Sequence, residues 1–206
     1  MAKKEEVPDY IAKHKKLYSH ATRLTDTASH THSEAYTSAV NKHLMVNGQV
    51  DFDKLDDNKV QLDFVKTMSD MYVSKAKQHF KVSKDLNELE EDLLMQAYVG
   101  VTNQQLKEQV SKYGKRFTHA QFDNIKQQLH ENIGKRLYAS AASHLEEENI
   151  PEIVKHIGLE SKIDANRITL EEATGLLEVF NREGSVSDSA LRQHVATYKV
   201  KKKKAS

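Results

Sequence analysis

The sequence predicts an all-α protein, a multi-helix bundle of about seven to nine helices with short connectors and a C-terminal helical hairpin. Helix-breaking residues are rare, with only 2 Pro and 7 Gly among 206 residues. Apolar residues recur at intervals of three and four, which is the spacing of one helix face. The only short alternating stretch typical of a strand is Val50-Asp51-Phe52.

Nine helical segments follow from the apolar spacing, in the order of the chain. The predicted segments are residues 11–28, 35–44, 62–80, 86–99, 103–113, 119–145, 153–157, 169–181 and 187–199. The clearest apolar stripe runs through Phe64, Met68 and Phe80. Asn47-Gly48 is expected to end the second segment, because both residues tolerate the left-handed conformation that closes a helix.

A recurring capping pattern marks several helix starts. In Val101-Thr102-x-x-Gln105 the Thr hydroxyl can accept from a first-turn N–H, and the Gln amide can reach back to the Thr backbone. Val101 and Leu106 can pack on each other across the start of the helix. Four starts of this general kind are predicted, at Thr102, Thr118, Thr169 and Ser187.

Glycine and proline mark the corresponding ends. A glycine just after an apolar-periodic run suits the left-handed residue that terminates a helix. Four such ends are predicted, at Gly100, Gly114, Gly158 and Gly184. Pro151 suits the first turn of a short helix, where its missing N–H costs nothing.

The element pattern divides the chain into three regions. Residues 1–158 are expected to form the main bundle, and residues 159–198 the C-terminal helical hairpin, which could pack on it. Residues 199–206 form a basic tail. The tail holds five lysines, so the formal net charge of +1 conceals a net charge of −4 over the rest of the chain.

Composition restricts the chemistry and the compartment. The absence of cysteine excludes disulfides, thiolate metal sites and cysteine nucleophiles. It also fits a cytoplasmic location, which we expect because Met1–Tyr10 lacks the apolar core of a secretory signal. The longest uncharged stretch, Leu93–Leu106, has 14 residues and is too short and too polar for a membrane span.

Motifs for catalysis or cofactor binding are missing. The sequence has no phosphate-binding GxGxxG or GxxxxGK[ST] loop, no HExxH zinc motif and no GxSxG nucleophile turn. Four aspartates between residues 51 and 57 lack the glycine and closing glutamate of a calcium loop, so they indicate a solvated acidic turn. We therefore expect no enzyme activity and no cofactor.

The densest histidine group, His30-Thr31-His32-Ser33-Glu34, has two interpretations. Imidazole and carboxylate groups can bind zinc, and an extended backbone would place His30, His32 and Glu34 on one side. The segment also lies between two predicted helices, where polar residues are typical of a solvated connector. We expect the connector, and we expect no metal site.

Residues 102–130 could form part of a helix-turn-helix. Three predicted helices with tight connectors end in one whose N-terminal residues could contact phosphates or bases. The side chains expected to do so are Lys112, Lys115, Arg116, His119, Gln121, Asn124 and Lys126. Against this, the third helix is long, and helical hairpins mostly build protein cores.

The lysine run Lys201, Lys202, Lys203 and Lys204 leaves three alternatives open. It could be a solvated terminus, a non-specific contact to phosphates or an anionic surface, or, in a eukaryote, a nuclear import signal. The leading hypothesis is a non-enzymatic helical protein-interaction or assembly protein that binds a protein partner or itself. The alternative is a nucleic-acid-binding protein that uses residues 102–130 and the lysine tail.

Overall fold

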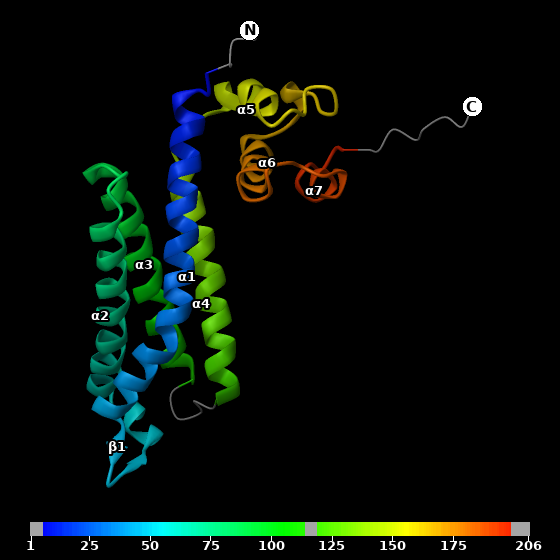
Figure 1. The fold of residues 1–206 in the computed structure, drawn as a ribbon. Helices are drawn as coiled ribbons and strands as arrows, with labels where there is room; N and C mark the ends of the chain where they lie inside the picture. The colour runs from blue at the N-terminus through cyan, green and yellow to red at the C-terminus, as the bar shows by residue number, and fades with distance from the viewer. Residues whose placement is uncertain (1–5, 114–118, 199–206) are drawn as a thin grey trace. The chain divides into compact units, whose positions relative to one another are not determined.

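The computed structural model describes residues 6–113 and 119–198 and confirms the all-α fold (Figure 1). Seven α-helices lie in this part of the chain: α1 (Asp9–His43), α2 (Asn58–Val82), α3 (Glu88–Tyr113), α4 (His119–Ala141), α5 (Ile150–His156), α6 (Leu170–Glu183) and α7 (Asp188–His194). Short 3-10 turns occur at Phe52–Asp56, Glu147–Asn149 and Ala165–Arg167. The described strands are β1 (Met45–Val46) and β2 (Gln49–Val50), which pair antiparallel around Asn47 and Gly48.

The chain divides into two compact units. Residues 19–141 form one of them, called here the bundle unit. Residues up to 18, together with those from 142 onward, form the other, called here the terminal unit. Helix α1 supplies residues to both, and the expected boundary at residue 158 lies inside the terminal unit.

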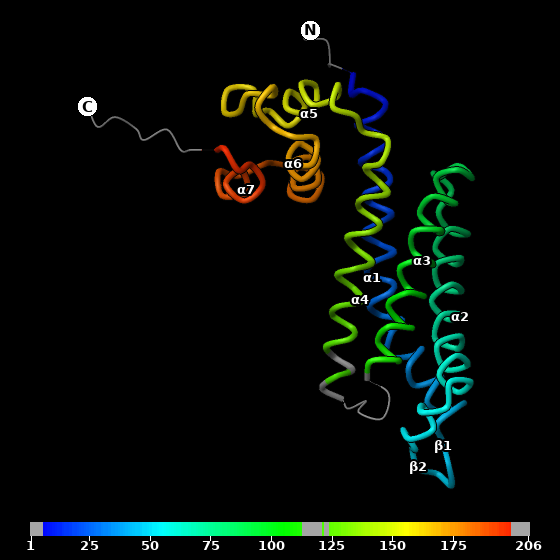
Figure 2. The backbone as a smooth tube through the Cα atoms, turned by 180° about the vertical axis from the view of Figure 1, so that it is seen from behind, coloured from blue at the N-terminus to red at the C-terminus, as the bar shows by residue number. Residues whose placement is uncertain are grey.

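Four long helical segments build the bundle unit. The two opposite views in Figures 1 and 2 show α2, α3 and α4 running in alternating directions, with the C-terminal part of α1 beside them. Helix α3 packs on both α2 and α4. The centre of the unit is filled by large buried side chains, including Leu24, Phe64, Met68, Leu94 and Tyr98. Burial of such side chains supplies the main driving force for folding.

The predicted break between residues 28 and 35 is wrong, because α1 is one helix of 35 residues. In its polar middle, threonine hydroxyls are satisfied by carbonyls one turn back, as Thr31 is by Thr27. His32, expected in a solvated connector, is buried and contacts the hydroxyl of Tyr72 on α2. Tertiary packing therefore overrides the polar composition of this segment.

The predicted helix end at Gly100 and start at Thr102 are also wrong. Helix α3 runs from Glu88 to Tyr113 without interruption, and Gly100 does not take a positive φ. Thr102 is buried in the helix interior, and its hydroxyl has no partner among the described residues. Tertiary packing outweighs the local capping pattern here, because Leu94, Tyr98 and Leu106 form one buried face that continues through the expected break.

Other predicted starts and ends are confirmed. Thr169 and Glu172 form the reciprocal capping box of α6, and Ser187 caps α7 by accepting from the Ala190 backbone N–H. Gly158 and Gly184 have φ angles of 72° and 77°, the left-handed conformation expected at helix ends. Pro151 lies in the first turn of α5. The predicted positions Gly114 and Thr118 lie outside the described residues.

The terminal unit has an apolar core of its own. Ile11 from α1 joins Ile153, Leu176 and Leu191 from α5, α6 and α7 in one buried cluster. Partly buried hydrogen bonds also lie in this unit: the Asn181 amide donates to Nδ1 of buried His14, and Nε2 of His144 donates to the backbone carbonyl of Tyr10. In the described part of the chain, no helix combines the length and apolar character needed to cross a membrane.

Candidate functional site

The α2–α3 hairpin of the bundle unit carries the most distinctive polar and apolar arrangement. Helix α2 begins at the side chain of Asp57, which accepts from the backbone N–H groups of Lys59 and Val60. It ends at Val82, and residues 83–87 lead into α3. Asn87 and Glu90 then form a reciprocal cap, with backbone-to-side-chain distances of 2.9 and 3.1 Å. This cap fixes the start of α3 and the end of the connector.

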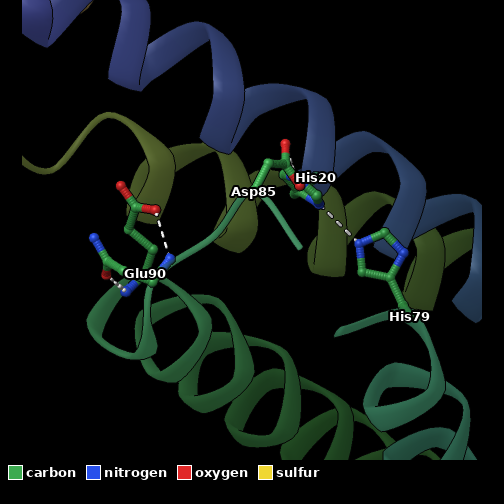
Figure 3. A network of polar contacts seen from close by, with 5 residues as sticks. His20, His79, Asp85 and Glu90 are labelled. Carbon is green, nitrogen blue, oxygen red and sulfur yellow. Dashed lines mark hydrogen bonds and ion pairs between the residues drawn. The ribbon is translucent and has the colours of Figure 1, made fainter. Parts of the chain in front are cut away.

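A histidine–aspartate network ties this connector to α1 (Figure 3). Nδ1 of His20, on α1, lies 2.9 Å from Nε2 of His79, on α2. Nε2 of His20 lies 3.0 Å from a carboxylate oxygen of Asp85, in the connector. Figure 3 shows the His20 ring between the other two side chains. His20 is almost fully buried, whereas the Asp85 side chain is largely exposed.

The hydrogen-bonding roles in this network follow from Asp85. An ionised carboxylate only accepts, so Nε2 of His20 donates to it. With Nε2 as the donor, Nδ1 of His20 can accept from Nε2–H of His79. Burial lowers the pKa of His79, with His20 and Arg23 adding to the decrease and Asp85 opposing it. The lowered pKa favours the neutral form of His79, and the two contacts of His20 hold the connector against α1.

A groove runs between α2 and α3 beside this end of the hairpin. It encloses about 270 Å³ and is called here the α2–α3 groove. Its lining residues are Lys77, Phe80 and Lys81 of α2 and Glu91, Asp92 and Met95 of α3. Phe80 is buried and Met95 is half-buried, so these two side chains form an apolar floor. A hollow of about 450 Å³ continues along α2 past Lys77, and is lined by Asp70, Val73, Ser74, Lys77, Gln78 and Lys81.

The charged side chains of the groove are unpaired within the described residues. Lys77 and Lys81 are exposed on α2, and neither forms an ion pair with Glu91 or Asp92 on α3. Two large apolar side chains at this end of the hairpin are also exposed: Val82 by 79% and Leu89 by 81%. The groove thus combines an apolar floor with unpaired charges, which are components of a protein contact surface.

The residues predicted to contact nucleic acid are only partly described. Lys112 lies in the last turn of α3, and Gln121, Asn124 and Lys126 follow on α4, with Asn124 exposed and Gln121 and Lys126 half-buried. His119 is the first residue of α4. The predicted residues outside the described part are Lys115, Arg116, Lys201, Lys202, Lys203 and Lys204.

The three-helix arrangement expected for residues 86–130 is not formed. Its first two helices and the turn between them are a single helix, α3, so the predicted helix-turn-helix lacks its first turn. Phosphate contact by Lys112, Asn124 or Lys126 stays a prediction. Among the side chains that the structure describes, which exclude those of His119 and Asp123, no three His, Asp or Glu gather closely enough to hold a metal ion.

Sequence reasoning did not single out the groove or the histidine network. One signal was present, since Asn87-x-x-Glu90 is a capping box directly before an apolar-periodic run. The rest depends on which helices pair, because His20 and Asp85 are 65 residues apart in the chain. Comparison of the chain with protein-family models, curated proteins and solved structures found no match.

Proposed function

We propose that this chain is a non-enzymatic helical protein-interaction or assembly protein, and that the α2–α3 groove is its contact surface. The observation that supports this most strongly is the apolar floor of Phe80 and Met95 between charged side chains that lack a partner in the described part of the chain. A partner that covers this floor gains the free energy of apolar burial, and its own charges can pair with the groove walls.

The α2–α3 groove, of about 270 Å³, is continued along α2 by the hollow of about 450 Å³, so it is elongated in the direction of the helix. It is formed by two adjacent helices, which suits an amphipathic helix lying along it. Val82 and Leu89 are exposed apolar residues near the connector but do not line the groove. Single exposed apolar residues are ordinary, but these lie at the same end of the hairpin as the groove.

The histidine network supports a structural role more than a catalytic one. Both ring nitrogens of His20 are engaged, one with His79 and one with Asp85. The His20 ring is also almost fully buried, so a substrate in solvent would not reach it. Its position at the connector instead suits the fixing of the α2–α3 hairpin, and with it the shape of the groove.

Charge gives little support to nucleic-acid binding by the bundle unit. Residues 19–141 contain 16 lysines and arginines and 16 aspartates and glutamates. Binding to a phosphate backbone depends on a local surplus of cations, because released counterions supply most of the free energy. The acidic side chains of the α2–α3 groove would also repel a duplex.

A photo-crosslinking amino acid at position 89, introduced into cells that make the protein, tests the proposed function. We expect a covalent adduct with a protein, because Leu89 is exposed in the first turn of α3, close along the helix to Glu91 and Asp92 of the groove. The same amino acid at Leu62 is the matched control, since Leu62 is also exposed and lies near the other end of α2. The adduct at position 89 should disappear in a Met95→Lys variant that retains its helical circular dichroism. Equal adducts at both positions, or none at position 89, would contradict the proposal.

A further inference from the structure

We propose that the partner in the α2–α3 groove is a second copy of this chain, bound about a twofold axis that runs along the groove. The inference rests on the proposed function, since it names the occupant of the same surface. It follows from how charge is distributed across the groove and from the symmetry of a dimer.

The two walls of the groove carry opposite charge. Lys77 and Lys81 are one helical turn apart on α2, so both point from the same side of that helix. Glu91 and Asp92 line the groove from α3, on the other side of the apolar floor. Lys77, Lys81 and Asp92 are exposed and Glu91 is half-exposed, so all four are accessible to a partner. A matching surface must therefore present an acidic edge to α2 and a basic edge to α3.

A second copy presents that surface only in one orientation. A twofold axis along the groove places the α2 wall of each copy opposite the α3 wall of the other, so lysines meet carboxylates on both sides. A twofold axis across the groove places like walls together, and lysines would then face lysines. The charge pattern thus favours a parallel arrangement of the paired hairpins and disfavours the antiparallel one.

The apolar residues fit the same arrangement. With the axis along the groove, the two floors face each other, and the exposed part of each Met95 side chain is removed from water, while Phe80 is already buried. Methionine adapts its shape to a facing surface more readily than branched residues do. A nucleic acid, in contrast, would meet Glu91 and Asp92 with its phosphates. A second copy would therefore cover the apolar floor and pair with the charges of both walls.

Charge reversal of each wall tests this inference by sedimentation equilibrium. Lys77→Glu with Lys81→Glu makes both walls acidic, and Glu91→Lys with Asp92→Lys makes both walls basic. Each double variant should self-associate about 100-fold more weakly than the wild type, because like charges then face each other on both sides. A 1:1 mixture of the two double variants should form a heterodimer, since an acidic groove then faces a basic one.

Recovery in the mixture separates a charge effect from damage to the fold, because misfolded chains would not recover each other. A wild-type protein that remains monomeric at millimolar concentration would overturn the inference. Unchanged self-association of both double variants would overturn it as well. If the crosslink at position 89 then joined a different protein, the proposed function would stand without the second copy. The absence of any crosslink at position 89 would contradict both the proposed function and this inference.

Discussion

Lowering the pH from 7 to 4 is expected to destabilise the bundle unit by about 3 kcal/mol through His32 alone. Burial lowers the pKa of His32 to about 4, and nearby Lys126 adds to the decrease. In the unfolded chain His32 binds a proton near pH 6.5, whereas in the folded chain it binds one only near pH 4. The stability contributed by neutral His32 is therefore complete above pH 6.5 and is lost as the pH falls to 4.

Denaturant unfolding at pH 7 and pH 4 measures this effect. The variant His32→Gln should lose about 3 kcal/mol less than the wild type between the two pH values, because it has no ring to protonate. His30→Gln is the matched control, since His30 lies two residues away and is exposed. Should His32→Gln fail to fold, the ring signals of His32 in the wild type can be followed by NMR. A wild-type His32 that titrates near pH 6.5 would disprove the prediction.

The replacement Glu178→Gln is expected to stabilise the terminal unit at high pH by up to about 3 kcal/mol. Burial raises the pKa of Glu178, on α6, to about 7, although Arg182 opposes the increase. Its carboxyl group ionises near pH 4.5 in the unfolded chain and near pH 7 in the folded one. Glu178 therefore costs stability progressively as the pH rises through this interval, and a neutral amide avoids that cost.

Unfolding of the Glu178→Gln variant and the wild type at pH 4.5 and pH 8.5 tests this expectation. The advantage of the variant should be largest at pH 8.5 and small at pH 4.5. Glu171→Gln is the matched control, because Glu171 lies on the same helix and is exposed. An advantage for Glu178→Gln that does not change with pH would show that the amide acts by packing and not by its charge.

In the terminal unit, two titratable groups change the stability in opposite directions as the pH falls. In the terminal unit, His14 has a pKa lowered to about 4 by burial and by His144, so acid destabilises it. Glu178, in the same unit, loses its ionisation penalty over nearly the same pH interval. The two contributions therefore oppose each other in the terminal unit.

The helical fold class and the ends of the last helices could be predicted from the sequence because their determinants are local. The side chains of Thr169 and Ser187 cap backbone groups only three residues away. Gly158 and Gly184 supply the positive φ that other residues rarely adopt. Such interactions leave a signature within a few positions of the chain.

The continuity of α1 and α3 could not be predicted in the same way. A capping signature at Thr102 and a polar stretch around His32 both indicated breaks, but burial of these residues keeps each helix intact. The α2–α3 groove was missed for a related reason. Its floor joins Phe80 to Met95, and only the pairing of two helices shows that they meet.

The methyl signals of methionine provide the most direct measurement of whether the α2–α3 groove is a contact surface between copies. Met95 lies in the groove, Met68 is buried in the bundle unit, and Met45 is exposed on β1. In a dilution series of wild-type protein with ¹³C-methyl methionine, we expect the Met95 signal to move with concentration while the other two stay fixed. It should not move in the Lys77→Glu, Lys81→Glu variant. A Met95 signal that is independent of concentration, or a moving Met45 signal in its place, would contradict the assignment of this surface.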